Sequence, residues 1–321
     1  MSESSKKKKV LIIGMAGGLA RITARLLLTE HPDWEVLGVD TRSLADLPAL
    51  KGLETLTMKY SRGNFENLFR AHHFDLVLHL GRISHSSNDA DVLAKRLELS
   101  VMGTNRILEL CLRSGIKKVV VLSTFHVYGA LPDNSIFLGE EAPLRASIKH
   151  PELRDVVEMD QLCGQFMWKH QSELSTVVLR PCNIIGTQIQ NAMSRFLTNP
   201  LALRPMDYNP FFQFIHEFDM AQVLCRALTE LPTGTYNVAG SDFISLREAL
   251  DLVGSKGLPF PITLAKGLNE GLKLFKIDVP EYLLDYLKFS CLISNAQLTK
   301  ALGPDFLRFG IKETLELIRL K

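Results

Sequence analysis

The sequence of 321 residues lacks the features that mark several classes of protein. Its five cysteines lie far apart without a CxxC pair, so we expect reduced, cytoplasmic thiols and neither a disulfide framework nor a zinc cluster. Neither sign of charge dominates, with 37 Lys and Arg against 35 Asp and Glu, which disfavours a nucleic-acid-binding protein. The content of hydrophobic residues, 46%, excludes a disordered chain. The length suits one large α/β domain with a smaller lobe.

The N-terminus imitates a targeting segment, because Lys6 to Lys9 precede the uncharged run Val10 to Ala20. That run is too short to span a bilayer, and the pattern continues as an amphipathic helix through Arg21 and Arg25. We therefore expect a strand that enters a helix, a solvated lysine tail, a cytoplasmic location and no stable membrane insertion. Contact of the tail with an acidic partner is the alternative.

Short apolar runs alternate with long helical patterns through the first 180 residues. This alternation predicts a parallel sheet wrapped by helices, an α/β fold. The runs expected to be strands are 10–13, 36–39, 53–58, 76–80, 119–122 and 176–179. A long crossover helix is expected over 88–114, and a second helix from about 152 to just before 175.

The alternation of apolar runs and helical patterns ends after Gly186, where Pro200, Pro205 and Pro210 interrupt regular secondary structure. We expect a smaller, mostly helical C-terminal lobe here, with helix candidates at 281–287 and 311–320. The segments 211–215 and 235–238 look like returns to the first domain. The predicted boundaries are therefore 6–186 plus 211–240 for the first domain, and 187–210 plus 241–321 for the second lobe.

A glycine turn follows the first strand directly. Glycines there let the backbone approach a pyrophosphate, whose charge the free N–H groups and the dipole of the next helix stabilise. Asp40 ends the next strand, where a carboxylate can accept hydrogen bonds from both hydroxyls of an adenosine ribose. Asp40 favours NAD(H) over NADP(H), although Arg42 could pair with a 2′-phosphate. The residues assigned to the cofactor from this pattern are Gly14, Ala16, Gly17, Gly18, Leu19 and Asp40.

Six further motifs follow in order: Asp75–Gly81, Val101–Asn105, Ser123–Gly129, Leu179–Gly186, Gln213–Asp219 and Gly234–Val238. With the glycine turn, they resemble the extended short-chain dehydrogenase/reductase superfamily, and specifically its NAD-dependent epimerase/dehydratase branch, over about residues 9–255. The resemblance implies a doubly wound parallel Rossmann sheet, NAD as cofactor, and a small-molecule substrate or ligand in a cleft between the lobes. It implies cofactor contacts from Leu80, Gly81, Pro181 and Asn183, and it leaves a homodimer open.

The sequence departs from this family at the positions that carry catalysis. The family's Tyr-x-x-x-Lys pair is missing: alignment on Asp160 puts Glu152 in the tyrosine position and Val156 in the lysine position, where we expect a core residue. A lysine one turn from the tyrosine lowers the pKa of the phenol, and a valine cannot. Thr124 matches the family's catalytic Ser or Thr, and His126 follows it as a substitute acid or base.

Other positions near the expected site are also altered or ambiguous. The family's arginine for a substrate diphosphate is replaced within Phe211–Gln213, although Arg195 and Arg204 could supply charge from another direction. Glu158 and Asp160 are expected on an exposed helix face. The neighbouring His72 and His73 would point apart on a helix, so we expect no metal site.

Two functions remain open from the sequence. The first is an NAD(H)-binding, epimerase/dehydratase-like protein whose redox activity is reduced, rebuilt or lost. The alternative is an active nucleotide-sugar epimerase, dehydratase or reductase that uses Thr124, Glu152 or His126 as substitute acid/base residues. Whether the chain is an enzyme is therefore left undecided.

Overall fold

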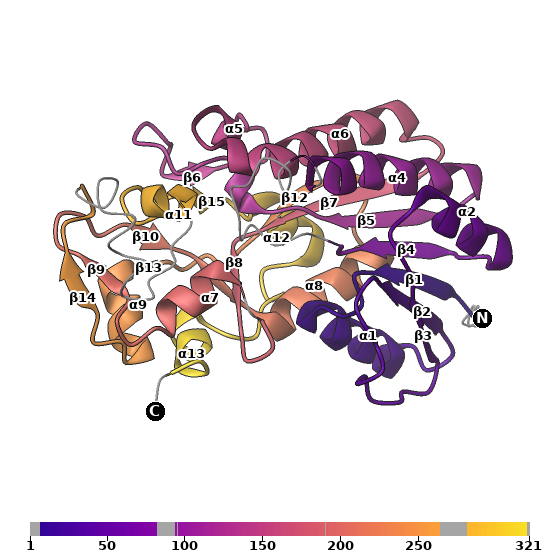
Figure 1. Cartoon of the computed structure of the whole chain (residues 1–321), viewed down its shortest axis with the longest axis horizontal. Helices are drawn as coiled ribbons and strands as arrows, with labels where there is room; N and C mark the ends of the chain where they lie inside the picture. Colours follow the sequence, from indigo (N-terminus) through magenta and orange to yellow (C-terminus); the bar gives the residue numbers. More distant parts are fainter. Residues whose placement is uncertain (1–6, 82–93, 95, 190, 264–280, 320–321) are drawn as a thin grey trace. The chain divides into compact units, whose positions relative to one another are not determined.

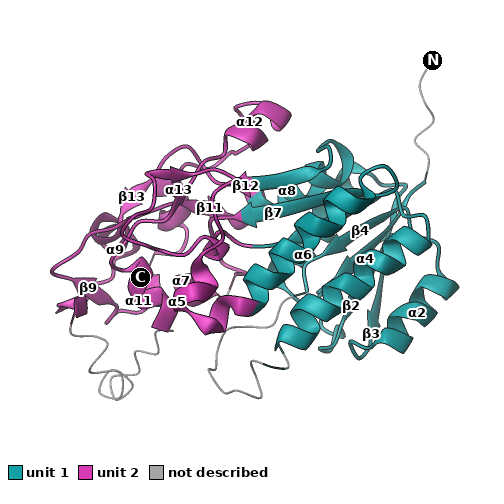
Figure 2. Ribbon diagram, turned by 90° about the horizontal axis from the view of Figure 1, so that it is seen from above, with its two compact units in different colours: residues 1–123, 155–180, 220–236 teal, residues 124–154, 181–219, 237–321 magenta. Residues whose placement is uncertain are grey.

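The computed structural model describes residues 7–81, 94, 96–189, 191–263 and 281–319. The chain divides into two compact units (Figure 2). Unit 1 comprises residues 1–123, 155–180 and 220–236, and unit 2 comprises residues 124–154, 181–219 and 237–321. Each unit is described by itself below.

Unit 1 is built on a seven-stranded sheet in the order β12-β7-β5-β4-β1-β2-β3. The pairings from β3 through to β7 are all parallel. The strands are β1 (Lys9–Ile13), β2 (Glu35–Asp40), β3 (Leu53–Thr57), β4 (Leu76–His79), β5 (Lys118–Leu122), β7 (Ser175–Pro181) and β12 (Gly234–Val238). All six strands predicted from apolar runs are confirmed, with ends that differ by one or two residues. β3 differs from the other predicted strands, because most of its residues are exposed at the edge of the sheet.

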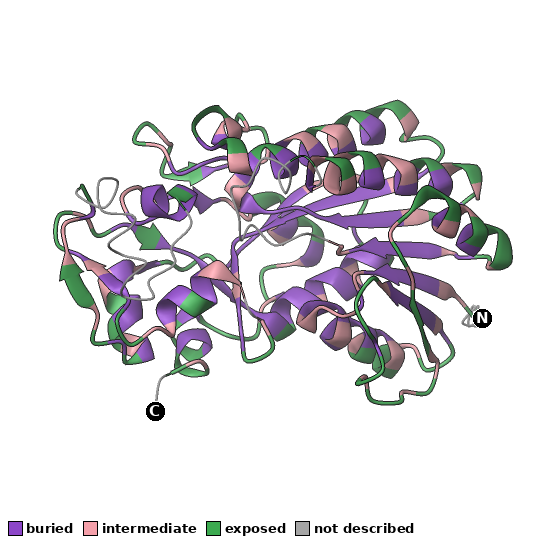
Figure 3. Ribbon diagram, viewed as in Figure 1, coloured by how far each residue is buried: buried purple, intermediate pink, exposed green. Residues whose placement is uncertain are grey.

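Helices cover both faces of this sheet (Figure 1). On one face lie α2 (Arg62–Ala71), α4 (Gly103–Arg113) and α6 (Arg154–His170), whose apolar residues share one core cluster with alternate residues of the strands. On the other face lie α1 (Gly18–Glu30) and α8 (Glu217–Thr229), which meet where the Cys225 thiol contacts the Thr23 carbonyl. Apart from the edge strand β3, the strands between these layers are largely buried (Figure 3). The predicted α/β doubly wound fold is confirmed.

The long crossover helix predicted over 88–114 is described only in its second half. A π-helical turn over Glu98–Met102 leads there into α4, which ends at Arg113 as expected. The start of the predicted helix lies outside the described residues. Gly103 is the first residue of α4. The Tyr60 ring packs on its backbone, and a Cβ at Gly103 would lie 2.6 Å from that ring.

Unit 2 contains short strands of two or three residues, which pair two by two. The pairs are β6 (Phe137–Leu138) with β15 (Leu292–Ile293), β8 (Asn183–Ile185) with β11 (Phe214–His216), β9 (Leu203–Pro205) with β14 (Leu258–Phe260), and β10 (Phe211–Phe212) with β13 (Ile244–Ser245). Its helices are α5 (Ala146–Lys149), α7 (Ala192–Leu197), α9 (Leu246–Val253), α11 (Glu281–Tyr286), α12 (Ala296–Leu302) and α13 (Ile311–Glu316).

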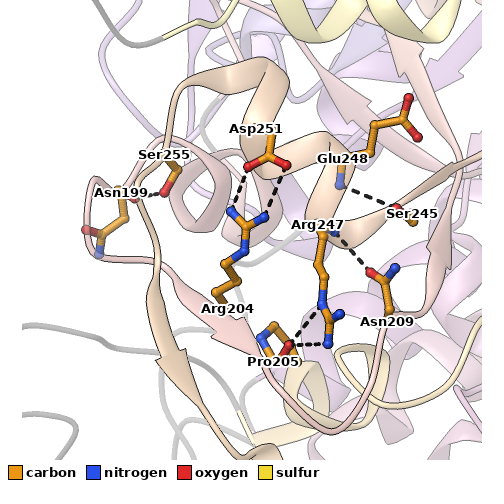
Figure 4. A network of polar contacts seen from close by, with 9 residues as sticks. All are labelled: Asn199, Arg204, Pro205, Asn209, Ser245, Arg247, Glu248, Asp251 and Ser255. Atoms are coloured by element: carbon orange, nitrogen blue, oxygen red, sulfur yellow. Dashed lines mark hydrogen bonds and ion pairs between the residues drawn. The ribbon is translucent and has the colours of Figure 1, made fainter.

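Ladders this short leave much of the backbone of unit 2 to be held by side chains. Figure 4 shows one such case, where Arg204 and Arg247 connect α9 to β9 and to the loop after it. The Arg204 guanidinium binds the Asp251 carboxylate through two hydrogen bonds of 2.6 and 3.1 Å. Arg204 is thus committed to an ion pair with Asp251 within unit 2.

The chain passes between unit 1 and unit 2 at or next to the ends of sheet strands. The chain enters unit 2 directly after β5 and at the last residues of β7 and β12. The predicted boundaries give residues 124–154, 181–186, 211–219 and 237–240 to the first domain, whereas the contacts of these residues place them in unit 2. All five cysteines are buried and unpaired. Among the described helices, none has the length and apolar character needed to cross a membrane.

Candidate functional site

The turn between β1 and α1 has the geometry of an anion site. Gly14 adopts a φ of 96°, and the N–H groups of Gly14 and Met15 donate to the Val39 carbonyl at 2.9 and 3.1 Å, which ties the turn to β2. Gly17 is the N-cap of α1 and provides no capping side chain. The first N–H groups of α1 thus stay available to a ligand, at the positive end of the helix dipole.

The glycine turn lies against the end of β4. A Cβ at Gly14 would lie 2.9 Å from the backbone N of Gly81 and from the carbonyl carbon of Leu80. Only glycine fits this approach, and only glycine adopts this φ without strain. The structure therefore brings together Gly14, Leu80 and Gly81, which lie far apart in the sequence and were predicted for one site.

Asp40 is fixed at the carboxyl end of β2. Its Oδ2 accepts a hydrogen bond of 2.9 Å from the Ala16 N–H, and its Oδ1 accepts one of 2.9 Å from the Arg42 N–H. Burial raises the pKa of Asp40, but the hydrogen bonds from Arg42 and Ala16 outweigh burial and lower it overall. Asp40 is thus an ionised acceptor, as recognition of ribose hydroxyls requires.

A cavity of about 520 Å³ lies over these residues in unit 1. It is lined by Ile13, Gly14, Gly17, Val39, Asp40, Thr41, Arg42, Met58, Tyr60, Phe65, Leu80, Gly81, Leu99 and Ser100. The apolar wall formed by Met58, Tyr60, Phe65 and Leu99 was not predicted from the sequence. Met58 and Tyr60 follow β3 directly, so the rule that ligands bind at the carboxyl ends of parallel strands could have identified them.

The remaining residues predicted for the cofactor have other surroundings. Gly18 and Leu19 open α1, and the Leu19 side chain is buried. Pro181 and Asn183 belong to unit 2, where the buried Asn183 amide donates to the Gln213 carbonyl at 3.2 Å. Their part in cofactor binding stays a prediction.

Thr124 and His126 form a hydrogen-bonded pair in unit 2. Thr124 caps the 3-10 turn Phe125–Val127, and its Oγ1 lies 2.9 Å from His126 Nδ1. The His126 ring is half-buried, because the rings of Tyr282 and Tyr286 on α11 pack edge-on against it. Burial raises the pKa of Tyr286 well above its usual value, so this phenol stays protonated. His126 is therefore packed against aromatic rings and is not a solvated loop residue.

Glu152 lies in the 3-10 turn Pro151–Leu153 and belongs to a cluster of four charges in unit 2. His150 bridges two carboxylates, with Nε2 at 2.7 Å from Asp285 and Nδ1 at 3.4 Å from Glu152. Lys149 adds a second cation at 2.5 Å from Asp285. We call these four residues the His150 cluster.

The His150 cluster fixes the charge of its members. Burial lowers the pKa of His150, but the two carboxylates outweigh burial and raise it to about 9. The pKa of Glu152 is lowered overall, because hydrogen bonding to His150 outweighs the effect of burial. Glu152 is therefore ionised at neutral pH and cannot donate a proton there.

The first two turns of α6, in unit 1, hold the positions that replace or flank the missing pair. Val156 is only 3% exposed, which confirms the expected core position. Asp160 is also buried, and its carboxylate binds the Arg180 guanidinium at 2.6 and 3.0 Å and the Ser123 hydroxyl. The expectation of an exposed Asp160 is wrong, because this carboxylate faces the carboxyl ends of β5 and β7 and is paired there.

No group of three or more potential metal-binding side chains occurs in the part of the chain that the structure describes. The described chemistry is therefore that of an anion site with an ionised ribose acceptor, together with a Thr–His pair and a neutralised charge cluster.

Comparison with known proteins connects these features to a family. The solved dTDP-glucose 4,6-dehydratase of Bacillus anthracis, in complex with NAD, has a TM-score of 0.74 at 14% identity, over 97% of this chain and 94% of that one. The UDP-glucose 4-epimerase of Thermotoga maritima, solved with UDP-glucose, has a TM-score of 0.73 at 16% identity, over 96% of each chain. At these identities, the likeness shows the fold alone.

Curated relatives match over a shorter stretch. An uncharacterized protein of Mycobacterium tuberculosis is 25% identical over 188 residues, which are 58% of this chain and 50% of the relative. The chain thus spans about half the length of this relative. The model of the NAD dependent epimerase/dehydratase family matches residues 10–239, most of the chain and all strands of the sheet. The chain therefore belongs to the NAD dependent epimerase/dehydratase family.

Proposed function

We propose that this chain binds NAD(H) in the cavity of unit 1, and that its hydride-transfer chemistry is slow or lost because the tyrosine–lysine pair is absent. One contrast carries the proposal. The cofactor residues Gly14 and Asp40 keep their geometry, while the positions of the catalytic pair hold an ionised, paired Glu152 and a buried Val156.

The cavity suits the adenosine diphosphate part of a dinucleotide. The open N–H groups at the start of α1 would bind the pyrophosphate, and the Asp40 carboxylate would accept the ribose hydroxyls. The apolar wall of Met58, Phe65 and Leu99 would pack against a flat base. Bound NAD supplies the hydride acceptor, and these residues orient it.

The replacement of the pair removes two distinct contributions. A tyrosinate would take or return a proton, whereas the Glu152 carboxylate is held in its ionised form by His150. A lysine would stabilise the tyrosinate and bind the cofactor, whereas Val156 packs in the core. Loss of such general acid–base help lowers rates by roughly a hundredfold to ten-thousandfold.

A second function is favoured by one observation, the contact of 2.9 Å between Thr124 Oγ1 and His126 Nδ1. A histidine that hydrogen-bonds a hydroxyl can take its proton, so this pair could replace the tyrosine. The chain would then be an active epimerase, dehydratase or reductase. Its substrate class would be a nucleotide sugar, by analogy with the relative that was solved with UDP-glucose.

Calorimetric titration with NAD and NADH tests the binding. Chromatographic detection of an epimerised or 4-keto sugar product after incubation with dTDP-glucose or UDP-glucose tests the turnover. We expect both cofactor forms to bind and turnover to be slow, unchanged by Glu152→Gln. An ordinary enzymatic rate that His126→Asn abolishes, with cofactor affinity intact, would establish the second function instead. Failure of both cofactor forms to bind would refute the proposal.

We also propose a cytoplasmic location, on the grounds of the scattered, unpaired cysteines. Fractionation of expressing cells tests it, and recovery with membranes after a salt wash would contradict it.

A further inference from the structure

A second cavity of unit 1 lies in the helical layer, next to the cofactor cavity. It has a volume of about 380 Å³ and lies along α2 and α4, which pack side by side (Figure 2). The two cavities share Tyr60 and Phe65 as a wall. We call the second cavity the arginine pocket. Its charged and phenolic lining consists of Tyr60, Arg62, Glu66, Arg106, Glu109 and Arg113.

The charges of the arginine pocket are unequal in number. Three arginines and two glutamates line it, so one positive charge is in excess. Both carboxylates already have partners. Glu66 accepts a hydrogen bond of 2.8 Å from Arg62 Nε, and Glu109 accepts one of 3.0 Å from the Asn105 side-chain amide. The acidic groups of the pocket are therefore bound, and they leave two arginines over.

The two remaining arginines, Arg106 and Arg113, lie on one face of α4, seven residues or two helical turns apart. Arg106 is half-buried and Arg113 is exposed. Neither side chain makes a hydrogen bond or an ion pair with another residue in the described part of the chain. Their guanidinium groups are thus donors that an anion can use.

Tyr60 adds an unsatisfied donor. Its hydroxyl is buried, and it has no hydrogen-bond partner among the described residues. The ring packs on Gly103, and the hydroxyl oxygen would lie 3.2 Å from a Cβ there. Burial raises the pKa of Tyr60 above its usual value, although the nearby Arg106 opposes this, so the phenol is protonated at neutral pH. A buried donor without an acceptor costs free energy, and an acceptor oxygen of a ligand would remove that cost.

The N-terminus of α2 borders the same pocket. Ser61 caps this helix, and its Oγ accepts a hydrogen bond of 3.4 Å from the Asn64 N–H. The N–H groups of Arg62 and Gly63 have no acceptor within the helix. The space beside Gly63 is open, because a Cβ there would meet nothing within 4 Å. These N–H groups and the helix dipole add positive potential next to Tyr60.

We propose that the arginine pocket binds a small organic phosphate monoester, at a site separate from the cofactor cavity. The phosphate accepts hydrogen bonds from the Tyr60 hydroxyl and the Arg106 guanidinium, and the start of α2 stabilises its charge. A phosphate suits several converging donors because it offers three strong acceptor oxygens. The organic part packs against the apolar lining of Val101, Leu110 and Leu162.

Calorimetric titration of the full chain with phenyl phosphate, in a phosphate-free buffer, tests this proposal. We expect Arg106→Ala to bind phenyl phosphate at least about tenfold more weakly, because a charge-assisted hydrogen bond is lost. Tyr60→Phe should weaken binding by about tenfold, since it removes the hydroxyl and keeps the ring. Arg106→Lys should lie between Arg106→Ala and the unsubstituted chain, because it keeps the charge without the planar fork.

Two further variants locate the bound phosphate. Arg25→Ala is the matched control, because it removes an equal charge from an exposed position of α1, on the other face of the sheet. It should leave the affinity for phenyl phosphate unchanged. Gly14→Ala disturbs the anion site at the glycine turn, and binding of phenyl phosphate should survive this change. Thermal unfolding should show all variants folded.

Inorganic phosphate distinguishes the organic ligand from the free anion. It should bind more weakly than phenyl phosphate, because it makes no apolar contact. Equal affinity for the two would overturn the assignment to an organic ligand. The arginine pocket would be overturned as a phosphate site if phenyl phosphate did not bind, if Arg106→Ala left its affinity unchanged, or if Gly14→Ala abolished its binding.

Discussion

The cavity of unit 1 and the His150 cluster of unit 2 are built in different ways. In the cavity, residues predicted for one site, such as Gly14 and Asp40, lie together with the expected partners. In the cluster, Glu152 is paired with His150, which the Asp285 carboxylate of α11 also binds. The first site relies on backbone geometry, and the second on side-chain identity.

This difference has a physical reason. An anion site at a helix N-terminus uses N–H groups that every residue except proline provides, so it persists as long as its glycines do. A proton-transfer pair depends on two side chains with matched pKa values. We propose that a substitution in such a pair removes the chemistry and leaves the fold intact, because Val156, which the sequence alignment puts in the lysine position, is a buried core residue.

The largest effect is expected at Gly14, where the backbone argument can be broken directly. In Gly14→Ala, the methyl group would meet the backbone of Leu80 and Gly81 at 2.9 Å, at a φ of 96°. We expect NAD affinity to fall by about a hundredfold, because strain of about 1–3 kcal/mol adds to the displaced turn. Calorimetry measures it, with thermal unfolding to confirm the fold.

Gly63→Ala is the control for that change. Gly63 lies in α2, also in unit 1, and a Cβ there meets nothing within 4 Å. An alanine in a helix should stabilise the protein by a few tenths of a kcal/mol to about 1 kcal/mol and leave NAD affinity unchanged. Unaltered affinity in Gly14→Ala would show that the turn does not position the pyrophosphate, and the contrast between the two sites would disappear.

The sequence predicted the cofactor site better than the acid/base region, because the two depend on different distances along the chain. The glycine turn and Asp40 follow adjacent parallel strands, so local patterns place them at one edge of the sheet. The tie between His150 and Asp285 spans 135 residues, and no local pattern reports it. Asp160 was misjudged for the same reason, since its partner Arg180 comes from the next strand and not from α6. The apolar wall of the cavity was missed because Phe65 depends on how α2 packs.

A smaller effect is expected from His150→Gln, which tests the charges of the cluster. The pKa of His150 is raised from an ordinary value of 6.5 to about 9. Its stabilisation is therefore fully present below about pH 6.5, and it is lost as the pH rises through about 9. We expect the variant to lose about 1–2 kcal/mol of unfolding free energy at pH 6 and almost none at pH 10. Urea unfolding at both pH values, under reducing conditions, gives the difference.

His73→Gln serves as the control, because His73 is exposed on unit 1. It should change the unfolding free energy by less than about 0.5 kcal/mol at either pH. An equal loss at both pH values in His150→Gln would mean that this ring contributes packing and not charge. His150 would then not be what holds Glu152 in its ionised form.

The smallest effect on the free energy of unfolding is expected at the surface of unit 2. It tests which contacts stabilise a region whose strands are only two or three residues long. Arg204 pairs with Asp251, whose side chain is 60% exposed, whereas the Arg247 guanidinium donates to the Pro205 carbonyl at 2.9 Å (Figure 4). The Arg247 guanidinium also donates to the Met206 carbonyl at 2.9 Å. Solvent screens the ion pair, so Arg204→Ala should cost less than about 0.5 kcal/mol. Arg247→Ala should cost about 1–2 kcal/mol, because two carbonyls lose their donor. Urea unfolding ranks the two variants. A greater loss of unfolding free energy in Arg204→Ala than in Arg247→Ala would contradict this expectation. It would show that ion pairs stabilise unit 2 more than hydrogen bonds between side chains and backbone do. Unit 2 would then differ from the glycine turn of unit 1 by its reliance on charged side chains.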